Sequence, residues 1–425
     1  METWERLDSL WPSESLFAEK EWRRSLRPFP LSPKRVKELK RLGEVLDRFL
    51  RSADHIYRRS HRGSLPGWIA DYLDRGKSAS LISIGKDLAG ERPAVIRPDL
   101  ILQEQGVGLV EIDAVPGGIG LTAWLGEAYS ELGFDVLGGR RGMLEGMAGA
   151  FGPERDVVIS QESGDYRPEM SWLCDQLGEG WALHSAESYR PQKRPVYRFF
   201  ELFDLPQIPF AQEEVESPQG LEIQAPLRAF LEEKSWLALF WNPALREVWQ
   251  RELRAAHDQW LRKIIPYSWI MDPRPLPPHG SVPRLDLANF QGLTRLSQKE
   301  RQLVLKVSGF SDIGWGSRSV TVGHDVSQPD WNDAVGTALE SFDSQPYLLQ
   351  EMIPSRVVEH SYWREDQQRE VAMKGRVRLC PYYFREDGEV HLRGVLATIC
   401  PEDKKILHGM SDAILVPCME DVEGY

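Results

Sequence analysis

The chain has 425 residues, of which 41% are hydrophobic and 10% aromatic, and its formal net charge is −12. One hydrophobic core rarely organises this length, so we expect two or three globular units. The negative charge and the lack of a long Lys/Arg tract argue against nucleic acid as a partner. No run of about 20 apolar residues is present, and the first residues are charged, which argues against a membrane partner or a secretory signal. We therefore expect a cytoplasmic protein; the sequence does not indicate its oligomeric state.

An amphipathic helix is predicted near the N-terminus, because apolar residues recur at three- and four-residue intervals between positions 34 and 51. Short extended runs, a glycine cluster, a helix over 121–132 and an apolar run over 134–137 then indicate an α/β layer. A buried strand over 156–160, followed by a helix over 168–177 with proline in its first turn, indicates a second α/β unit.

The second half of the chain begins with a stretch at helical spacing, 231–261, and a proline-rich segment over 266–278 then marks a boundary. Beyond it the pattern predicts strands over 303–308 and 347–352, a helix over 331–342, and two long extended runs over 370–384 and 389–400. The four cysteines are far apart, with no Cys-x-x-Cys pair, so we expect reduced, mostly buried thiols at Cys174, Cys380, Cys400 and Cys418.

A hairpin with one charged face is predicted between Arg97 and Asp113. Apolar and charged residues alternate on both sides of Glu104-Gln105-Gly106, which fits a three-residue loop. Pairing symmetric about residue 105 puts Asp99 opposite Glu111 and Arg97 opposite Asp113. Like charges this close are unfavourable without a cation, and hard oxygen ligands suit Mg²⁺, so we predict a metal site at Asp99, Glu111 and Asp113. The alternative is a half-exposed hairpin with an ordinary surface salt bridge.

Two segments are candidates for binding an anion or a substrate. Gly117 and Gly118 lead into a predicted helix, where backbone amides can approach an anion at the positive end of the helix dipole. Arg167 opens the next helix and is a candidate for a substrate carboxylate, although a capping or salt-bridge role is equally compatible with its position.

A nucleotide site is predicted after residue 300. Lys306 stands on an apolar strand, where it can neutralise phosphates, and the loop that follows can offer backbone donors. This is not a P-loop, because GxxxxGK[ST] is absent. Arg376 and Arg378 share one face of an extended run and can reach a phosphate. Alternatively, Lys306 snorkels from a strand end and the loop is a plain turn. The proposed nucleotide contacts in the loop and the next strand are Gly309, Gly314, Gly316, Ser317, Gln350 and Glu351.

Together these residues resemble the circularly permuted ATP-grasp family, in particular the synthetase domain of glutathionylspermidine synthases. In that group the metal ligands precede the nucleotide-binding lysine and hinge, as they do here. Its Arg-x-Asp and Glu-x-Asn motifs map onto Arg97 with Asp99 and onto Glu111 with Asp113, where many members have asparagine. The upstream phosphate-binding lysine of the family is absent from the nearest likeness, residues 242–245, which leaves Lys234 or Lys263. A Cys/His pair for the amidase domain of bifunctional members is also absent.

The resemblance implies an α/β (α+β) ATP-grasp fold with an associated substrate domain. It implies four parts: an N-terminal helical segment (1–90), a metal-binding part (91–150), an α/β substrate domain (151–230), and a helical segment with the nucleotide-binding part (231–425). It implies a cytoplasmic ligase that uses ATP and two Mg²⁺ to join a small-molecule carboxylate to an amine or peptide, with Arg97 and the metals stabilising the transferring phosphoryl group. Two alternatives are a non-catalytic ATP-binding regulatory or scaffold protein and a phosphotransferase.

Overall fold

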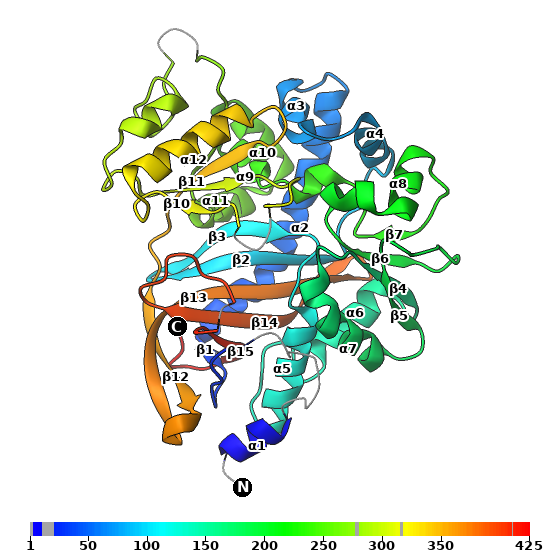
Figure 1. Ribbon diagram of the computed structural model, residues 1–425, viewed down its shortest axis with the longest axis vertical. Coiled ribbons are helices and arrows are strands. Elements are labelled where there is room, and N and C mark those ends of the chain that lie inside the picture. The colour runs from blue at the N-terminus through cyan, green and yellow to red at the C-terminus, as the bar shows by residue number, and fades with distance from the viewer. Residues whose placement is uncertain (1–2, 11–20, 277–279, 315–317, 410) are drawn as a thin grey trace. The chain divides into compact units, whose positions relative to one another are not determined.

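The computed structural model describes residues 3–10, 21–276, 280–314, 318–409 and 411–425 (Figure 1). The chain divides into two compact units. Unit 1 comprises Met1–Phe49, Glu91–Leu227 and Ser355–Tyr425, and unit 2 comprises Leu50–Gly90 and Arg228–Pro354. The helix predicted near the N-terminus is confirmed as α2 (Pro33–His61), which contributes its first part to unit 1 and the remainder to unit 2. Residues 50–90 thus fold with the segment that begins at Arg228.

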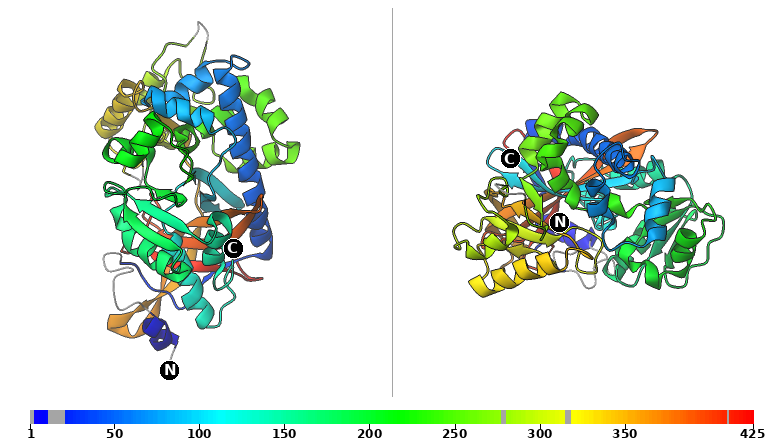
Figure 2. Two further views of the ribbon diagram at one scale, coloured as in Figure 1. Left: turned by 90° about the vertical axis from the view of Figure 1, so that its right-hand side faces the viewer. Right: turned by 90° about the horizontal axis from the view of Figure 1, so that it is seen from above.

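Within the described residues, unit 1 contains a seven-stranded sheet in the order β1-β15-β14-β13-β2-β3, with β12 also paired to β13. Its pairs are antiparallel except for the parallel pair β1 and β15. The late strands β13 and β14 lie beside β2 and β3, although these pairs of strands are far apart in the sequence (Figures 1 and 2). The strands are β1 (Phe29–Leu31), β2 (Val95–Gln103), β3 (Gly106–Asp113), β12 (Val357–Arg364), β13 (Arg369–Glu386), β14 (Glu389–Pro401) and β15 (Ile414–Glu420).

Helices cover both faces of this sheet. A Cβ added at Gly43 of α2 would lie 2.6 Å from the ring of Tyr383, and one at Gly146 of α6 (Gly142–Phe151) would lie 2.6 Å from the ring of Phe384. Successive residues of a strand point to opposite faces, so α2 and α6 lie on opposite faces of β13. The predicted helix over 121–132 is confirmed as α5 (Ile119–Glu131), which packs against α6 and β14. The N-terminal helix α1 (Thr3–Leu10) contacts α5.

A parallel sheet in the order β5-β4-β6-β7 forms the second α/β layer of unit 1, as predicted. Helix α7 (Arg167–Leu177) connects β4 to β5 and packs against both strands, and α8 (Pro209–Glu216) follows β6. The strands are β4 (Arg155–Ile159), β5 (Trp181–Ser185), β6 (Val196–Phe199) and β7 (Ile223–Gln224).

Unit 2 is built on an antiparallel sheet in the order β10-β9-β11-β8. Its core joins the sheet to α12, because Trp331, Val335 and Ala338 of that helix cluster with Leu303, Leu305 and Val307 of β9. The predicted strands over 303–308 and 347–352 and the predicted helix over 331–342 are confirmed. The elements are α3 (Trp68–Asp74), α4 (Ala79–Asp87), α9 (Ser235–Trp241), α10 (Arg246–Glu252), α11 (Ala255–Ile264), β8 (Ser268–Ile270), β9 (Leu303–Val307), β10 (Thr321–Val322), α12 (Gln328–Glu340) and β11 (Tyr347–Glu351).

Three local predictions need correction. The helical stretch over 231–261 is three short helices, because Asn242 and Pro243 end α9 with a turn in which the Asn242 side chain accepts from Ala244 N. The boundary expected in the proline-rich segment is wrong, since β8 lies within that segment and pairs with β11 after it, and unit 2 runs continuously from Arg228 to Pro354. The run over 134–137 forms only an isolated bridge, between Val136 and Met419.

The cysteine prediction is confirmed, as all four thiols are free and buried. No helix in the described parts of the chain has the length and apolar character needed to cross a membrane.

Candidate functional site

The predicted pairing in the β2–β3 hairpin of unit 1 is confirmed. Arg97 lies opposite Asp113, and Asp99 lies opposite Glu111. The two carboxylates of β3 therefore face an arginine and a carboxylate of β2. The metal site was predicted from this arrangement.

The turn that connects these strands differs from the prediction. Gln103 pairs with Gly106, so the loop has two residues and not three. That loop alone would leave Asp99 one residue out of register with Glu111. A β-bulge between Asp99 and Leu100 restores the predicted pairs, because one strand gains an extra residue there. Bulges commonly re-aim side chains next to active sites.

Asp99, which is 6% exposed, lies between two guanidinium groups. Arg97 Nε is 3.2 Å from Asp99 Oδ1, and Arg378 Nη1 donates to Oδ2 at 3.0 Å. Arg97 also donates from Nη2 to Asp113 Oδ2 at 2.9 Å. The structure thus brings Arg378, predicted as a cofactor contact, to the same carboxylate as Arg97. Its neighbour in the prediction, Arg376, instead bonds to the backbone carbonyls of Ser355 and Glu402.

The protonation states follow from burial and from these ion pairs. Burial disfavours the charge on Arg97, but Asp99 and Asp113 outweigh it and raise the pKa of Arg97 well above its ordinary value. Burial raises the pKa of Asp113, with Arg97 opposing the shift. Burial and the nearby Asp99 carboxylate raise the pKa of Cys380 to about 12. Cys380, which donates from Sγ to Asp99 Oδ1 at 3.4 Å, is therefore a protonated donor and not a nucleophile.

The donor chemistry of the hairpin suits a divalent cation. Asp99, Glu111 and Asp113 supply hard carboxylate oxygens, and Arg97 and Arg378 leave their combined charge negative. A metal would have to share or replace the guanidinium contacts of Asp99. In the described part of the chain, no group of three or more His, Cys, Asp or Glu side chains is arranged to hold a metal ion. The metal-ligand assignment therefore stays a prediction.

The glycine turn before α5 already has a hydrogen-bond acceptor, and it belongs to the protein. Glu169 of α7 is buried and accepts from the backbone N–H groups of Gly118, at 2.7 Å, and Leu121, at 3.0 Å. A Cβ at Gly117 would lie 2.3 Å from Tyr166, so glycine is required there by packing. A neighbouring helix thus supplies a cap to the first turn of α5, and the predicted anion-binding role of Gly117 and Gly118 stays a prediction.

Arg167, the other predicted substrate contact, lies where two parallel strands end. Its Nη2 is 3.4 Å from the carbonyl oxygen of Ile159 and 3.4 Å from Ser185 Oγ. Ile159 ends β4 and Ser185 ends β5. The carboxyl ends of parallel strands are the edge at which α/β sheets commonly bind ligands. Its substrate role stays a prediction.

In unit 2, Lys306 points into a buried polar cluster. The residue is 5% exposed, and its Nζ donates to Gln350 Oε1 at 3.3 Å. Gln350 in turn donates to Ser268 Oγ at 3.1 Å. Lys306 therefore does not snorkel to solvent from a strand end, and the structure brings together two of the predicted nucleotide contacts.

The two candidate upstream lysines differ in position and burial. Lys234, just before α9, donates from Nζ to the carbonyl oxygen of Gly314 at 2.9 Å, while its backbone N–H donates to Ser308 O at 2.8 Å. Lys263 is exposed in the last turn of α11. Lys234 thus lies at the loop that begins at Gly309, whereas two further predicted contacts, Gly316 and Ser317, lie outside the described residues.

A buried ion pair that sequence reasoning missed supports the same loop. Lys77 and Glu233, each with a side chain 2% exposed, lie 2.5 Å apart. Glu233 also accepts from Ser308 Oγ, and Ser308 bonds to Ser235 at 2.7 Å. Lys77 stands 5.1 Å from the ring centre of Phe310 in the loop. No local motif could have revealed this pair, because its members are 156 residues apart in the chain.

The predicted hinge at Glu351 has its backbone already occupied. The N–H of Glu351 donates to Tyr267 O, and that of Met352 donates to Gln302 O, both at 2.9 Å. These two donors cannot also bind an adenine edge. The Glu351 carboxylate pairs with Arg284 at 2.9 Å, and burial raises its pKa above the ordinary value. Only the side-chain role of Glu351 stays a prediction.

Comparison with protein-family models and with curated proteins found no match. Comparison with solved structures found 44 similar chains. One is a glutathione synthetase like-effector (GSS30) from Globodera pallida in its apo form, 13% identical, with a TM-score of 0.53 over 98% of this chain and 95% of that chain. Another, provisionally described as a gamma-glutamylcysteine synthetase from Methylobacillus flagellatus KT, is 13% identical over 90% of this chain and 87% of that chain, but its TM-score of 0.39 is too low to carry an argument.

At this identity the first likeness establishes architecture and leaves activity to be argued from the residues. The permuted element order and the relation to glutathionylspermidine synthases stay predictions. Over nearly its whole length the chain has a mixed α/β fold similar to that of a glutathione synthetase-like protein.

Proposed function

We propose that this protein is an ATP-dependent ligase that joins a carboxylate to an amine through an acyl phosphate. The observation that carries the proposal is the hairpin in which Asp99 faces Glu111 and Arg97 faces Asp113, in a chain with a glutathione synthetase-like fold. Independent support comes from Lys234, which lies against the glycine loop of unit 2. Lysines beside such a loop suit a polyphosphate, because point charges and backbone donors act on the same oxygens.

The residues of unit 2 are proposed to bind ATP. Lys306 and Lys234 would neutralise phosphate charge, and backbone N–H groups of the loop from Gly309 onward would donate to phosphate oxygens. Gln350 and the Glu351 carboxylate would contact the base or ribose. Gly314, Gly316 and Ser317 belong to the same proposed loop.

The hairpin of unit 1 is proposed to serve the reacting groups. Asp99, Glu111 and Asp113 would hold Mg²⁺, which when bound supplies charge neutralisation at the phosphates. Arg97 presents a planar fork, with which it would hold the transferring phosphoryl group at two points. Arg378, now paired with Asp99, would keep a second positive charge beside that group.

In the proposed reaction an oxygen of the substrate carboxylate attacks the γ-phosphorus of ATP. The bond to the bridging oxygen breaks, ADP leaves with the electron pair, and an acyl phosphate forms. The amine nitrogen then attacks the acyl carbon, phosphate leaves, and the nitrogen loses a proton to give the amide. The chain's own groups contribute by positioning and by neutralising charge, which are the main sources of catalysis in reactions of this kind.

Two alternative functions differ from ligation in the point at which the reaction would stop. A phosphotransferase would stop after the first step, and a regulatory ATP-binding protein would not turn over. The second alternative rested on the missing upstream lysine, and the contact between Lys234 and Gly314 weakens that reason.

The proposal is tested by incubating the protein with Mg-ATP and a panel of small acids crossed with amines, amino acids and peptides. ADP release together with an amide product, identified by mass, supports ligation. ADP with a stable phosphorylated product supports the phosphotransferase, and ATP binding without turnover supports the binding protein.

A matched variant assigns the chemistry to the hairpin. Glu111→Gln deletes a negative charge at constant size, and we expect it to remove most Mg-ATP-dependent turnover while the melting temperature stays close to that of the native protein. Native turnover by this variant at saturating Mg²⁺ would place the hairpin outside the active site.

A further inference from the structure

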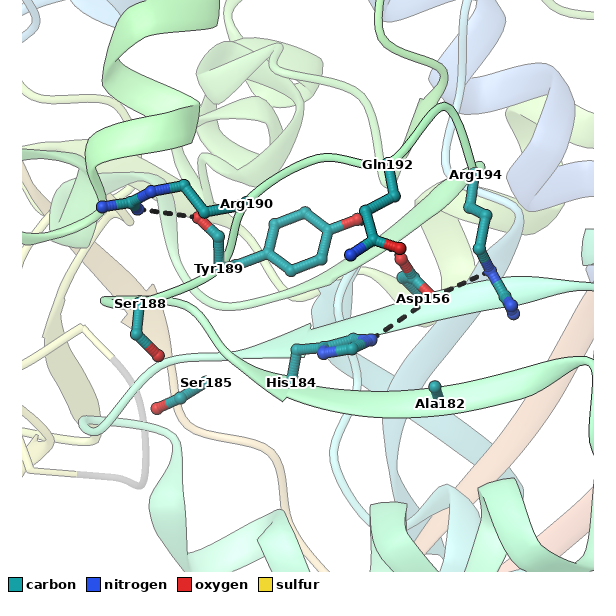
Figure 3. A pocket seen from close by; sticks show the side chains of 9 residues that line it. All are labelled: Asp156, Ala182, His184, Ser185, Ser188, Tyr189, Arg190, Gln192 and Arg194. Atoms are coloured by element: carbon teal, nitrogen blue, oxygen red, sulfur yellow. Dashed lines mark hydrogen bonds and ion pairs between the residues drawn. The ribbon is translucent and has the colours of Figure 1, made fainter.

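A pocket of about 260 Å³ lies on the parallel sheet of unit 1, and no residue of the proposed ligase chemistry lines it. Its walls come from β4, from β5 and from the loop that follows β5 (Figure 3). The side chains are nearly all polar, the exceptions being Ala182 and the ring of Tyr189.

The topology explains why the pocket exists. In the sheet order β5-β4-β6, the chain moves from β4 to β5 and then back across β4 to β6. Right-handed crossovers in opposite directions lie on opposite faces, so the second connection faces away from α7. Residues 186–195 make this connection as a turn and an irregular loop, all of it described, and not as a helix. The face beneath it is therefore covered incompletely, and Asp156 and His184 lie on that face within the pocket.

One buried carboxylate fixes the geometry of the pocket. Asp156 accepts from Tyr189 OH at 2.7 Å, and it lies 3.0 Å from Arg194 Nε and 3.4 Å from His184 Nε2. Figure 3 shows His184 and Arg194 approaching Asp156 from two sides. Both oxygens of Asp156 are therefore engaged by donors of the protein itself. Its role is to hold the donors of the pocket in place.

The remaining polar groups in the pocket are one guanidinium, two serine hydroxyls and one amide, all of which can donate a hydrogen bond. Arg190 contributes a guanidinium that bonds to the carbonyl oxygen of Tyr189 at 3.0 Å, and within the described chain no acidic side chain forms an ion pair with it. Ser188 and Gln192 are exposed on the same loop. Arg190 and Arg194 against one buried carboxylate leave the pocket positive. A positive, polar pocket lined with N–H and O–H donors selects an anion.

We propose that this pocket binds a small molecule through an oxyanion, either a carboxylate or a phosphate, with Arg190 as the principal contact and the Tyr189 ring as a flat apolar wall. The volume limits the ligand to a compact metabolite. None of the residues that line the pocket is assigned a role in the ligase proposal, and the lining residue Ser185 lies 3.4 Å from Arg167 Nη2.

The test is isothermal titration calorimetry of the full chain, without ATP and at constant ionic strength, with succinate and with inorganic phosphate as separate probes. The diamine putrescine serves as the cationic probe. We expect saturable binding of one anion per chain, and the stronger probe identifies carboxylate or phosphate as the preferred group. Arg190→Gln should weaken this binding at least about tenfold, since an exposed loop arginine is removed without touching the Asp156 cluster.

Lys193→Gln is the matched control, because Lys193 is exposed on the same loop, does not line the pocket and carries the same charge. It should bind the anion as the native protein does. Equal weakening by both variants would reduce the effect to general surface charge and overturn the proposal, as would binding of putrescine or of neither anion. ADP release by Arg190→Gln is measured separately, so failure of the pocket and failure of the ligase proposal give different results.

Discussion

At the scale of single residues, Arg97 has two possible roles, and its contacts are compatible with both. It bonds to Asp113, lies beside Asp99 and donates to the Gly117 carbonyl oxygen at 3.3 Å. A substitution by lysine distinguishes the two roles. Lysine can replace an arginine that only braces the hairpin, but it lacks the planar fork needed to hold a phosphoryl group at two points.

We expect Arg97→Lys to lower turnover at least about tenfold, equivalent to roughly 1.4 kcal/mol of transition-state stabilisation, with little change in ATP affinity. Steady-state kinetics and ATP titration separate these effects. A melting temperature that falls in proportion to activity would assign Arg97 to bracing instead.

The two lysines left open by the sequence provide a second residue-scale prediction. Lys234 contacts the glycine loop, whereas Lys263 is exposed on α11. Lys234→Ala should weaken ATP binding about tenfold or more, since losing one phosphate-paired charge in a desolvated site costs a few kcal/mol. Lys263→Ala, measured in the same titration, should bind ATP normally. Equal affinities for the two variants would contradict the assignment of Lys234.

Local patterns predicted the residue-scale geometry only where both partners lie close in sequence. Alternation of charged and apolar residues was enough to pair Asp99 with Glu111 across a short hairpin. Nothing local indicates that Arg378 reaches Asp99 from 279 residues away, or that Glu169 caps the glycine turn. Such contacts depend on which strands and helices become neighbours, which a single sequence does not specify.

At the scale of elements, the strands and helices with strong periodicity were predictable, and the irregular features were not. The long runs of β13 and β14 and the helices α5, α7 and α12 follow from apolar spacing. The bulge in the hairpin leaves no sequence signal, because one extra residue is compensated by a shorter loop. Helix α9 ends at Asn242 through local hydrogen bonding that the surrounding helical composition conceals.

The buried ion pair between Lys77 and Glu233 lies at the start of the glycine loop, where Glu233 accepts from Ser308. It leads to a prediction about stability. Lys77→Met leaves the Glu233 carboxylate buried without its cation and should destabilise the protein by about 3–5 kcal/mol. Adding Glu233→Gln removes that charge, while the glutamine oxygen can still accept from Ser308. The double variant should therefore recover most of the stability and keep a near-native KM for ATP. Denaturant unfolding measures the first effect and kinetics the second; a Lys77→Met variant as stable as the native protein would refute the ion pair's role.

At the scale of the whole molecule, the least predictable feature was which segments of the chain fold together into each unit. Unit 2 combines residues 50–90 with 228–354, and the sheet of unit 1 pairs β1 with β15, near opposite ends of the chain. Pairing strands that are so far apart depends on loop-closure entropy and on the packing of every intervening element. Spacing rules therefore predict the α/β class but not this connectivity.

The proposed binding of ATP by unit 2 predicts how ATP should change the stability of the folded protein. A ligand that binds only the folded state raises stability by an amount that grows with its concentration relative to Kd, about 2.7 kcal/mol at a hundredfold excess over Kd. If ATP binds through unit 2, Mg-ATP should raise the melting temperature of the native protein. Lys306→Met, which keeps the volume of this buried side chain but removes its charge, should abolish most of that shift. The Lys263→Ala variant should keep the full shift, because the charge that it removes is exposed to solvent in the last turn of α11. A Lys306→Met variant that is stabilised by ATP as strongly as the native protein would show that the nucleotide binds elsewhere, whatever its own melting temperature without ligand.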